Sequence, residues 1–412
     1  MFGNFLVLVG IMAAANPALA RTLRVNCDGF SVRDPPPLTF RPPLTFRTIG
    51  QALQVAIPGD TIQARGSCHE VVVITKDDLT LDGQGMTTID GAGQTVITID
   101  GARRVTIKGL TVQLGLDGLR ARGGAAVVLQ DVTATANTQD GIHITGSATA
   151  RLTDCTMQHN GRDGLSVFLS SNVNLAGTIV SNDNTRDGIH VTVHSVLSTG
   201  LPAANITTNN NMGDGIIVTQ HSSFVTGVSG TMLTAQNNDR FGVRVAATSA
   251  FFLATGTTLA ANANGVTGQF GGGLYVQQNA SFTMQAAGTG ATLTVQDNRS
   301  RGILVEDAGA LIVGGGTVTI QRNAVGGLQA FRSALVTFQG TSLAVQIRQN
   351  TGNGIEASDT SLQVSNSTIS GNTGGAVVLR FGTRATLNNN SIDTLPITCD
   401  DTVLSQGTTL CP

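Results

Sequence analysis

Apolar and polar positions repeat along most of this chain with nearly constant spacing. The repeating phrase begins with Asn, passes through three further residues to Gly, and continues with apolar residues in alternate positions. It first reads NTQDGIHI from Asn137 and last reads NTGNGIEA from Asn350, and successive glycines between them lie 23, 24, 27, 27, 31, 29, 25 and 27 residues apart. Such a period is typical of a solenoid, in which each repeat forms one coil.

Each repeat contains three short apolar runs, which predict three β-strands per coil. One run follows the Gly, as in Ile189–Val191, a second follows a Ser/Ala-rich bend, as in 333–338, and a third precedes the next Asn, as in 318–320. The positions one and three residues after the Gly are apolar in nearly every repeat, so alternation places both inside. A leucine-rich repeat would show a Leu/Asn consensus, and a propeller needs longer repeats. The pattern therefore predicts an all-β, parallel β-helix.

The recurrent Asn is expected to occupy one turn of every coil. Its amides would then stack as a hydrogen-bonded ladder along the solenoid. The repeat of Gly273 departs from this pattern, because it has no Asn at the usual offset and carries an insertion at 265–272. We expect this insertion to form a surface loop.

The N-terminal region predicts a leader, an irregular segment and a short helix. Residues 1–20 combine an apolar run with Ala18-Leu19-Ala20, a pattern typical of a signal peptide. Residues 21–47 are Pro-rich and contain PPLTFR twice. Residues 49–56 then place apolar side chains at helical spacing after a Thr48–Gln51 capping box. This helix is expected to cover the first coil, which would otherwise expose an unpaired edge.

The signal peptide predicts a secreted or periplasmic protein, where disulfides are stable. Five cysteines are present. We expect Cys27 to pair with Cys68, and Cys399 to pair with Cys411 and so close a tail at 396–412. Cys155 falls in a column that is otherwise apolar, which predicts a buried core thiol. No later segment predicts a membrane span in the mature chain.

Composition adds one exclusion. Charged residues make up 12% of the chain and the net charge is -2, so the electrostatic footprint of a nucleic-acid-binding protein is missing.

Two N-terminal stretches carry a resemblance to a known family. TIGQALQVAIPGDTIQARG from Thr48 and VVVITKDDLTLDGQG from Val71 resemble the cap and first coils of right-handed parallel β-helix repeat proteins in the pectin-lyase-like superfamily. The resemblance covers residues 48–395 and implies a single-stranded right-handed parallel β-helix with an N-terminal capping helix. The superfamily includes polysaccharide lyases, glycoside hydrolases, uronate epimerases, and phage and surface proteins, so the fold alone does not choose a function.

Charged residues cluster around four consecutive anchor glycines. The residue before the Gly is Asp in four repeats, and Arg precedes the Asp in two of them and lies at the same position, as Arg240, in the next repeat. Two residues after the Gly come His143, Ser166, His190, Ile217, Arg244 and Tyr275 in successive repeats. Coil stacking would place these side chains in rows about 5 Å apart. We interpret His143, Asp163, Arg162, Asp187, Arg186 and His190 as candidate catalytic residues, and Asp140, Asp214, Arg240, Arg244 and Tyr275 as candidate substrate-binding residues. Carboxylates in a row also make Ca²⁺ a candidate cofactor, with no other cofactor indicated.

These residues support two hypotheses. In the first, an exported β-helix binds or processes a polysaccharide, for example a uronate polymer, in a groove beside the Asp row that the 265–272 loop walls. The hydrolase motifs Gly-His-Gly and Arg-Ile-Lys are absent, so a lyase or epimerase is favoured over a hydrolase. The lyase motif Trp-x-Asp-His and the epimerase motif Asp-Pro-His-Asp are absent too. In the second hypothesis, the chain is a non-catalytic structural or surface rod, and each Asp only accepts backbone N–H groups and pairs with Arg.

Overall fold

The computed structural model describes residues 20–29, 45–267, 270–285, 290–393, 397–408 and 411. The predicted signal peptide and most of the Pro-rich segment therefore lie outside the described residues, and export stays a prediction. Among the residues described, no helix is long and apolar enough to cross a membrane.

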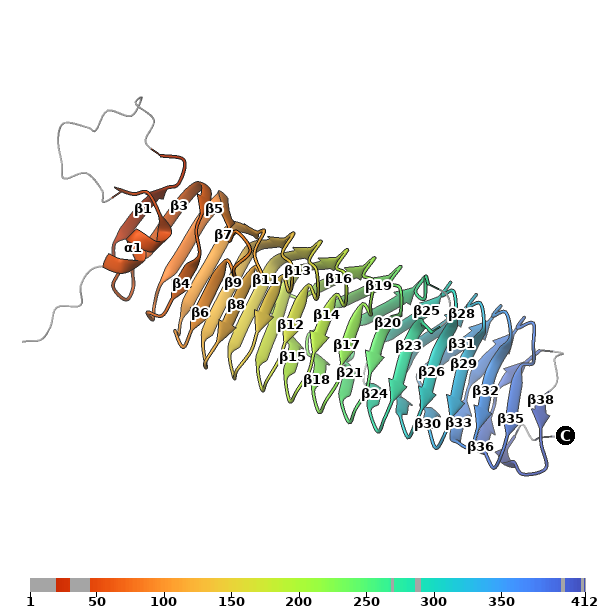
Figure 1. Cartoon of the computed structure of the whole chain (residues 1–412). Helices are drawn as coiled ribbons and strands as arrows, with labels where there is room; N and C mark the ends of the chain where they lie inside the picture. The colour runs from red at the N-terminus through yellow and green to blue at the C-terminus, as the bar shows by residue number, and fades with distance from the viewer. Residues whose placement is uncertain are drawn as a thin grey trace, which may run out of the picture.

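The chain winds into a long stack of parallel coils (Figure 1). One face, which we call the front sheet, has fourteen strands in the described residues, paired in parallel from one coil to the next. Its strands are β4 Val72–Ile74, β6 Ile97–Asp100, β8 Leu119–Arg122, β10 Ile142–Ile144, β12 Leu165–Val167, β14 Ile189–Val191, β17 Ile216–Val218, β20 Phe241–Val245, β23 Gly272–Gln277, β26 Arg301–Glu306, β29 Gly326–Phe331, β32 Asn353–Ser358, β35 Val377–Arg380 and β38 Ile397–Cys399.

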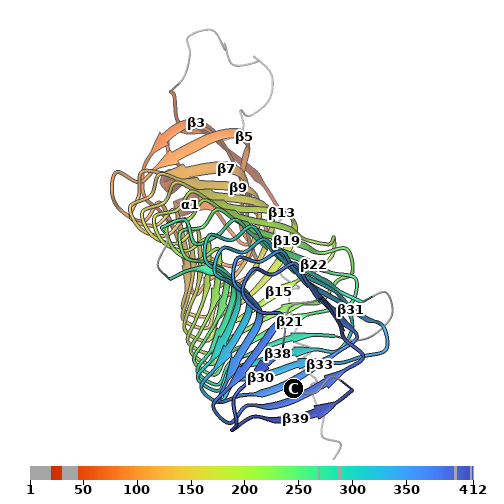
Figure 2. The same ribbon diagram turned by 90° about the vertical axis from the view of Figure 1, so that its right-hand side faces the viewer.

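The other two faces are joined at the N-terminal end, where long strands bend from one face to the next. These are β3 Thr61–His69, β5 Thr80–Asp90, β7 Val105–Gln113, β9 Ala126–Thr135, β11 Thr149–Gln158 and β13 Asn172–Asn182, and the shorter β1 Thr22–Asn26 pairs with the first of them. One half of β13 pairs with β15 and the other half with β16, so from that point each coil has three separate strands (Figure 2).

After β13 the second face contains β15 Val196–Thr199, β18 Ser223–Thr226, β21 Ala250–Leu253, β24 Ser281–Met284, β27 Ala310–Val313, β30 Leu335–Phe338, β33 Ser361–Ser365, β36 Arg384–Asn388 and β39 Leu404–Gly407. The third face contains β16 Asn205–Asn209, β19 Met232–Gln236, β22 Thr258–Asn262, β25 Thr292–Gln296, β28 Gly316–Gln321, β31 Leu343–Arg348, β34 Ser367–Ser370 and β37 Ser391–Ile392. The predicted all-β parallel β-helix is thus confirmed.

The core is one continuous column of stacked apolar side chains. Ile142 and Ile144 on β10 are fully buried, as alternation after the anchor Gly predicts. Equivalent positions stack from coil to coil, and Phe224, Phe251 and Phe282 contact one another with ring centroids 4.8 and 5.2 Å apart. Cys155 lies in this core as a free thiol, and burial raises its pKa to about 12.

The N-terminal end is covered by α1 Ile49–Val55, beside the short strand β2 Thr45–Phe46 (Figure 1). Thr48 caps the helix, and its hydroxyl accepts the N–H of Gln51 at 3.1 Å. Ile49 and Ala52 are buried against the first coils. Disulfides join Cys27 to Cys68 and Cys399 to Cys411, with Cα atoms 4.9 and 5.9 Å apart. Each end of the solenoid therefore has a covalent tie.

An asparagine ladder runs along one turn of the solenoid. In the described part of the chain, nine consecutive hydrogen bonds of 2.8–3.2 Å join each Asn Nδ2 to the Oδ1 of the next Asn. Its members are Asn137, Asn160, Asn184, Asn211, Asn238, Asn264, Asn298, Asn323, Asn350 and Asn372. The Gly273 repeat has no Asn at the usual offset, yet the ladder continues through it. Asn264 fills the position, because the insertion lies between it and the Gly.

Candidate functional site

The front sheet brings both predicted histidines, together with Arg244 and Tyr275, into one outward row. Strand pairing places one residue of each coil beside its neighbour, in the order Arg120, His143, Ser166, His190, Ile217, Arg244 and Tyr275. Neighbouring members are separated by one strand spacing, about 4.8 Å. His143 and His190 are therefore not adjacent, because Ser166 lies between them.

A column of buried aspartates lies at the start of these strands. Each Asp uses Oδ1 to accept the backbone N–H of the equivalent residue in the next coil, at 2.8–3.2 Å. The column contains the four predicted residues and one more: Asp117, Asp140, Asp163, Asp187 and Asp214. This contact is the structural role that the rod hypothesis assigns to the column.

Asp117 was missed in the sequence. The signal was present, because Asp117-Gly118 precedes the same alternation of apolar residues as in later repeats. Leu114 stands where the recurrent Asn is expected, and its presence hid the repeat.

The second carboxylate oxygen of the column faces the outward row. His143 Nδ1 lies 2.9 Å from Asp140 Oδ2, although the ring is turned so that the contact is not linear. His190 Nδ1 lies 3.3 Å from Asp163 Oδ2. The Nε2 atoms of both rings are buried and have no hydrogen-bond partner among the described residues. Because each Nδ1 faces a carboxylate, we assign the ring proton to Nδ1, which leaves Nε2 free to accept a proton.

Arginine side chains lie above the aspartates. Arg162 Nε donates to Asp140 at 2.8 Å, and Arg186 lies 3.5 Å from Asp163 and 3.4 Å from Asp187. The side chains of Arg162 and Arg186 are 36% and 47% exposed, whereas those of the carboxylates beneath them are at most 4% exposed. The guanidinium groups are therefore exposed to solvent, whereas the carboxylates lie beneath them. This surface favours the binding of anions, although the charges of the arginines and aspartates nearly balance.

The column contains carboxyl groups with opposite pKa shifts. Burial opposes the ionisation of Asp140, but His143 and Arg162 outweigh burial and hold the pKa of Asp140 below its ordinary value. Burial, together with the charges of Asp214 and Asp163, raises the pKa of Asp187 to about 6. One carboxylate is thus firmly ionised, whereas another takes up a proton in mildly acidic solution.

The raised pKa of Asp187 predicts a pH-dependent cost of folding. Because the unfolded side chain ionises near 3.8 and the folded one near 6, its contribution to stability is lost as the pH rises between these values. The difference between the two pKa values corresponds to about 3 kcal/mol in the free energy of unfolding. Asp187→Asn keeps Oδ1 as an acceptor, so we expect this variant to be more stable than the parent at pH 7 but not at pH 4.

Denaturant unfolding at several pH values measures this difference. Asp183→Asn, an exposed change in the same coil, is the matched control and should leave the pH profile unchanged. If the free energies of unfolding of the parent and of Asp187→Asn differ by the same amount at pH 4 and at pH 6, the raised pKa of Asp187 is contradicted.

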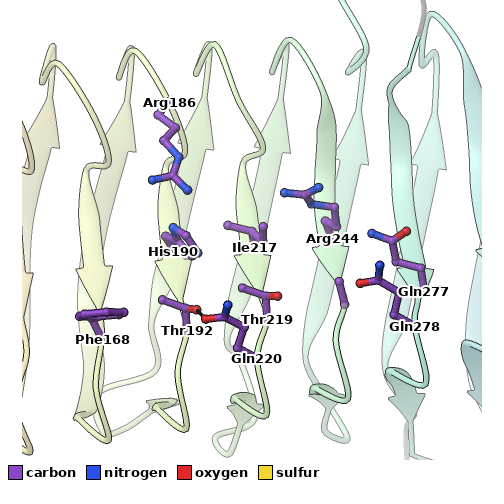
Figure 3. A pocket seen from close by; sticks show the side chains of 11 residues that line it. Phe168, Arg186, His190, Thr192, Ile217, Thr219, Gln220, Arg244, Gln277 and Gln278 are labelled. Carbon is purple, nitrogen blue, oxygen red and sulfur yellow. Dashed lines mark hydrogen bonds between the residues drawn. The ribbon is translucent and has the colours of Figure 1, made fainter.

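An open depression of about 500 Å³ lies on the front sheet beside this row (Figure 3). Its lining residues come from successive coils: Phe168, Arg186, His190, Thr192, Ile217, Thr219, Gln220, Arg244, Ala246, Gln277 and Gln278. Thr192 donates a hydrogen bond of 2.8 Å to Gln220 on its floor (Figure 3). Because these residues run from the coil of β12 to that of β23, the depression extends along the axis of the stack.

Of the five predicted substrate-binding residues, only Arg244 lines this depression. Asp140 and Asp214 belong to the buried column beneath it. Tyr275 is only 2% exposed, since its ring packs against Phe241 and Phe270 with centroids 4.7 and 5.5 Å away. Its hydroxyl donates to Glu306, and burial together with this bond raises its pKa. Tyr275 therefore offers no free ring face for a sugar. Arg240 is half-buried and forms no ion pair within the described residues.

The 265–272 insertion does not wall the depression as expected. Phe270 of this segment packs on Phe241 and Tyr275 instead, and no described residue of the insertion is among those that line the depression.

At this site, two groups of described residues have the spacing of metal ligands: Asp117 with Asp140 and His143, and Asp163 with Asp187 and His190. Within each group the ligand atoms lie within 4.8 Å of one another. Ca²⁺ takes six to eight oxygen ligands, whereas each group offers two carboxylates and an imidazole, with guanidinium groups close by. The donor set does not fit the predicted Ca²⁺, so we derive no step through it.

Three solved structures are similar to this protein over most of its length. The A-module of mannuronan C-5 epimerase AlgE4 from Azotobacter vinelandii has a TM-score of 0.42, with 88% of this chain and 92% of that chain covered. Pectate lyase Pel9A has a TM-score of 0.33, with 78% and 77% covered. An alginate lyase from Paenibacillus sp. has a TM-score of 0.22, with 93% and 99% covered. The identity is 14% for the first two and 12% for the third.

No curated protein matches the chain. The family described as right handed beta helix region matches residues 85–238 and 293–403. These two segments make up more than half of the chain, so the protein belongs to the right handed beta helix family.

Proposed function

We propose that this protein binds an acidic polysaccharide along the front sheet and removes a proton from one of its uronate residues. The observation that carries the proposal is His190. Its Nδ1 is held by Asp163, its Nε2 is unpartnered, and its side chain lines the depression. The hypothesis of a non-catalytic structural rod explains the Oδ1 contacts of the Asp column. It does not explain why a buried imidazole nitrogen has no hydrogen-bond partner.

The charges along the depression favour a polymer that carries carboxylates. Arg186 and Arg244 line the depression two coils apart, about 10 Å along the axis. Guanidinium groups bind carboxylates with two parallel hydrogen bonds. Because the depression follows the axis of the stack, an extended chain would meet both arginines at once.

The proposed reaction begins with neutralisation of the C6 carboxylate of one uronate residue. A proton on C5 of a uronate becomes more acidic when a guanidinium pairs with the C6 carboxylate. We assign this role to Arg186, because it lines the same depression as His190. His190 Nε2 then accepts the C5 proton as a general base. If the bond from C4 to the glycosidic oxygen breaks next, a C4–C5 double bond forms and the leaving oxygen takes a proton from water. If C5 instead regains a proton on its other face, the product is an epimer.

One incubation tests both outcomes. The protein is incubated in D₂O with polymannuronate, polyguluronate and polygalacturonate, and NMR follows deuterium at C5, which epimerisation introduces, while ultraviolet absorbance follows the C4–C5 double bond, which elimination introduces. We expect one of these two signals in at least one uronate polymer and neither in a neutral glucan. Absence of both signals in every uronate polymer, under conditions where the protein is folded, would overturn the proposal.

A further inference from the structure

The lining of the depression alternates along the axis between neutral and cationic coils (Figure 3). Arg186 and His190 line it in the coil of β14, and Arg244 lines it in the coil of β20. The coil of β17, between them, contributes Ile217 and two uncharged polar residues, and the coil of β12 contributes Phe168. At the other end, the coil of β23 contributes two glutamines. The order of the coils is therefore neutral, cationic, neutral, cationic and neutral.

Ile217 interrupts the positive charge at the centre of the depression. In the next coil, Arg244 Nε lies 2.8 Å from Oδ2 of Asp214, the carboxylate of the preceding coil. The same register places Ile217 above Asp187, but an apolar side chain cannot pair with a carboxylate. Asp187 instead meets Arg186 of its own coil, whose Nε lies 3.4 Å from Oδ2. An anion over Ile217 would therefore lose hydration against an apolar side chain and gain no cation from that coil.

We propose that the polysaccharide bound here carries a carboxylate on alternate sugars, with an uncharged sugar over Ile217. The inference rests on the function proposed above and names its substrate class. A 1,4-linked pyranose advances an extended chain by about 5 Å, close to the strand spacing of about 4.8 Å, so each sugar lies over one coil. The sugars over Arg186 and Arg244 then bear the carboxylates, and the sugar between them presents its C–H groups to Ile217.

The two ends of the depression fit uncharged sugars as well. Phe168 is partly exposed and lies one coil before His190, and an aromatic ring offers an apolar face to the C–H groups of a pyranose. Gln277 and Gln278 line the opposite end, and side-chain amides both donate to and accept from hydroxyl and N-acetyl groups. A chain in which a uronate alternates with an N-acetylhexosamine therefore matches all five coils.

Calorimetric titration with hexasaccharides tests the inference. Hexasaccharides of hyaluronan and of heparosan, in which glucuronate alternates with N-acetylglucosamine, are compared with those of polymannuronate and polygalacturonate. The His190→Gln protein is titrated beside the parent, so that turnover does not disturb the measurement. We expect at least one alternating hexasaccharide to bind about tenfold more tightly than either homopolymer, although it carries half as many carboxylates. Equal or tighter binding of a homopolymeric hexasaccharide would overturn the inference.

Ile217→Arg tests the residue on which the alternation depends. Arg244 occupies the equivalent position of the next coil, and Asp187 offers the new guanidinium a partner, so we expect the fold to be retained, as circular dichroism checks. The preference for alternating chains should be lost, because consecutive carboxylates then each meet a cation. Thr234→Arg, at an outward position of the third face, adds the same charge elsewhere and should leave the preference unchanged. A preference that persists in folded Ile217→Arg would contradict the inference.

Binding and chemistry can fail separately. If alternating hexasaccharides bind most tightly but no uronate polymer gains deuterium at C5 or a double bond, the proposed reaction fails and the ligand class stands. If a homopolymer both reacts and binds most tightly, the reaction stands and the alternation fails. The titration of the parent protein gives this answer without any variant at Ile217.

Discussion

Asn211→Ala is expected to lower the free energy of unfolding by about 3–5 kcal/mol, because it opens the asparagine ladder in its middle. Asn211 Nδ2 donates to Asn238 Oδ1 at 3.0 Å and to the backbone carbonyl of Ser181 at 3.1 Å. Its Oδ1 accepts both the backbone N–H and Nδ2 of Asn184, each at 3.0 Å. The substitution leaves the Asn184 N–H buried without an acceptor, and such a group costs about 1–3 kcal/mol by itself.

Two measurements check this expectation. Denaturant unfolding gives the overall loss, and amide hydrogen exchange at Asn184 reports the local opening that a solenoid permits between neighbouring coils. Asn172→Ala, an exposed Asn on β13, is the matched control and should change stability by no more than about 0.5 kcal/mol. Equal effects of the two substitutions would show that the ladder does not stabilise the fold.

His190→Gln is expected to slow C5 exchange by about 10²–10⁴-fold, the usual contribution of a general base. The Gln side chain keeps a polar group near Asp163 but cannot accept a proton at neutral pH. Binding of the polymer should survive, because Arg186 and Arg244 remain in the depression. The expected signature is therefore a loss in kcat with little change in KM.

His194→Gln provides the control for this substitution. His194 lies four residues along the same coil, is exposed, and stacks on His221 with ring centroids 5.1 Å apart. It does not line the depression, so its replacement should leave exchange unchanged. If both substitutions have the same small effect, His190 is not the base, and the site would need another proton acceptor.

The fold could be predicted because its determinants are local and periodic. An apolar pair after each Gly, as in Ile142 and Ile144, fixes which face is buried whatever the remainder of the coil contains. The same regularity predicted the Asp column and the outward row, since parallel stacking places equal offsets side by side. The prediction failed where a repeat departs from the phrase: Asn264 has another offset from its Gly, and the repeat of Asp117 has Leu114 in place of the Asn.

The details of the site depend on contacts that periodicity does not encode. Tyr275 has the offset of an exposed residue, yet Phe270 of the insertion packs on it, and the packing of an irregular loop cannot be read from repeat spacing. Which oxygen of Asp163 meets His190 and which meets a backbone N–H is settled by side-chain rotation. The division of Asp163 into an Oδ1 that accepts a backbone N–H and an Oδ2 that faces His190 therefore appears only in three dimensions.

The strict coil-to-coil register has a consequence for how such a surface can change over generations. Each coil contacts mainly the coils before and after it, so duplication or loss of one whole coil leaves the remaining packing nearly intact. The distance between two chemical groups on the front sheet then changes in whole steps of one strand spacing, about 4.8 Å. A coil inserted between those of His143 and His190 would increase the distance between the two rings by one such step, whereas a point substitution changes only the side chain at one position. We therefore expect the spacing of chemical groups on this scaffold to change through the gain or loss of whole coils.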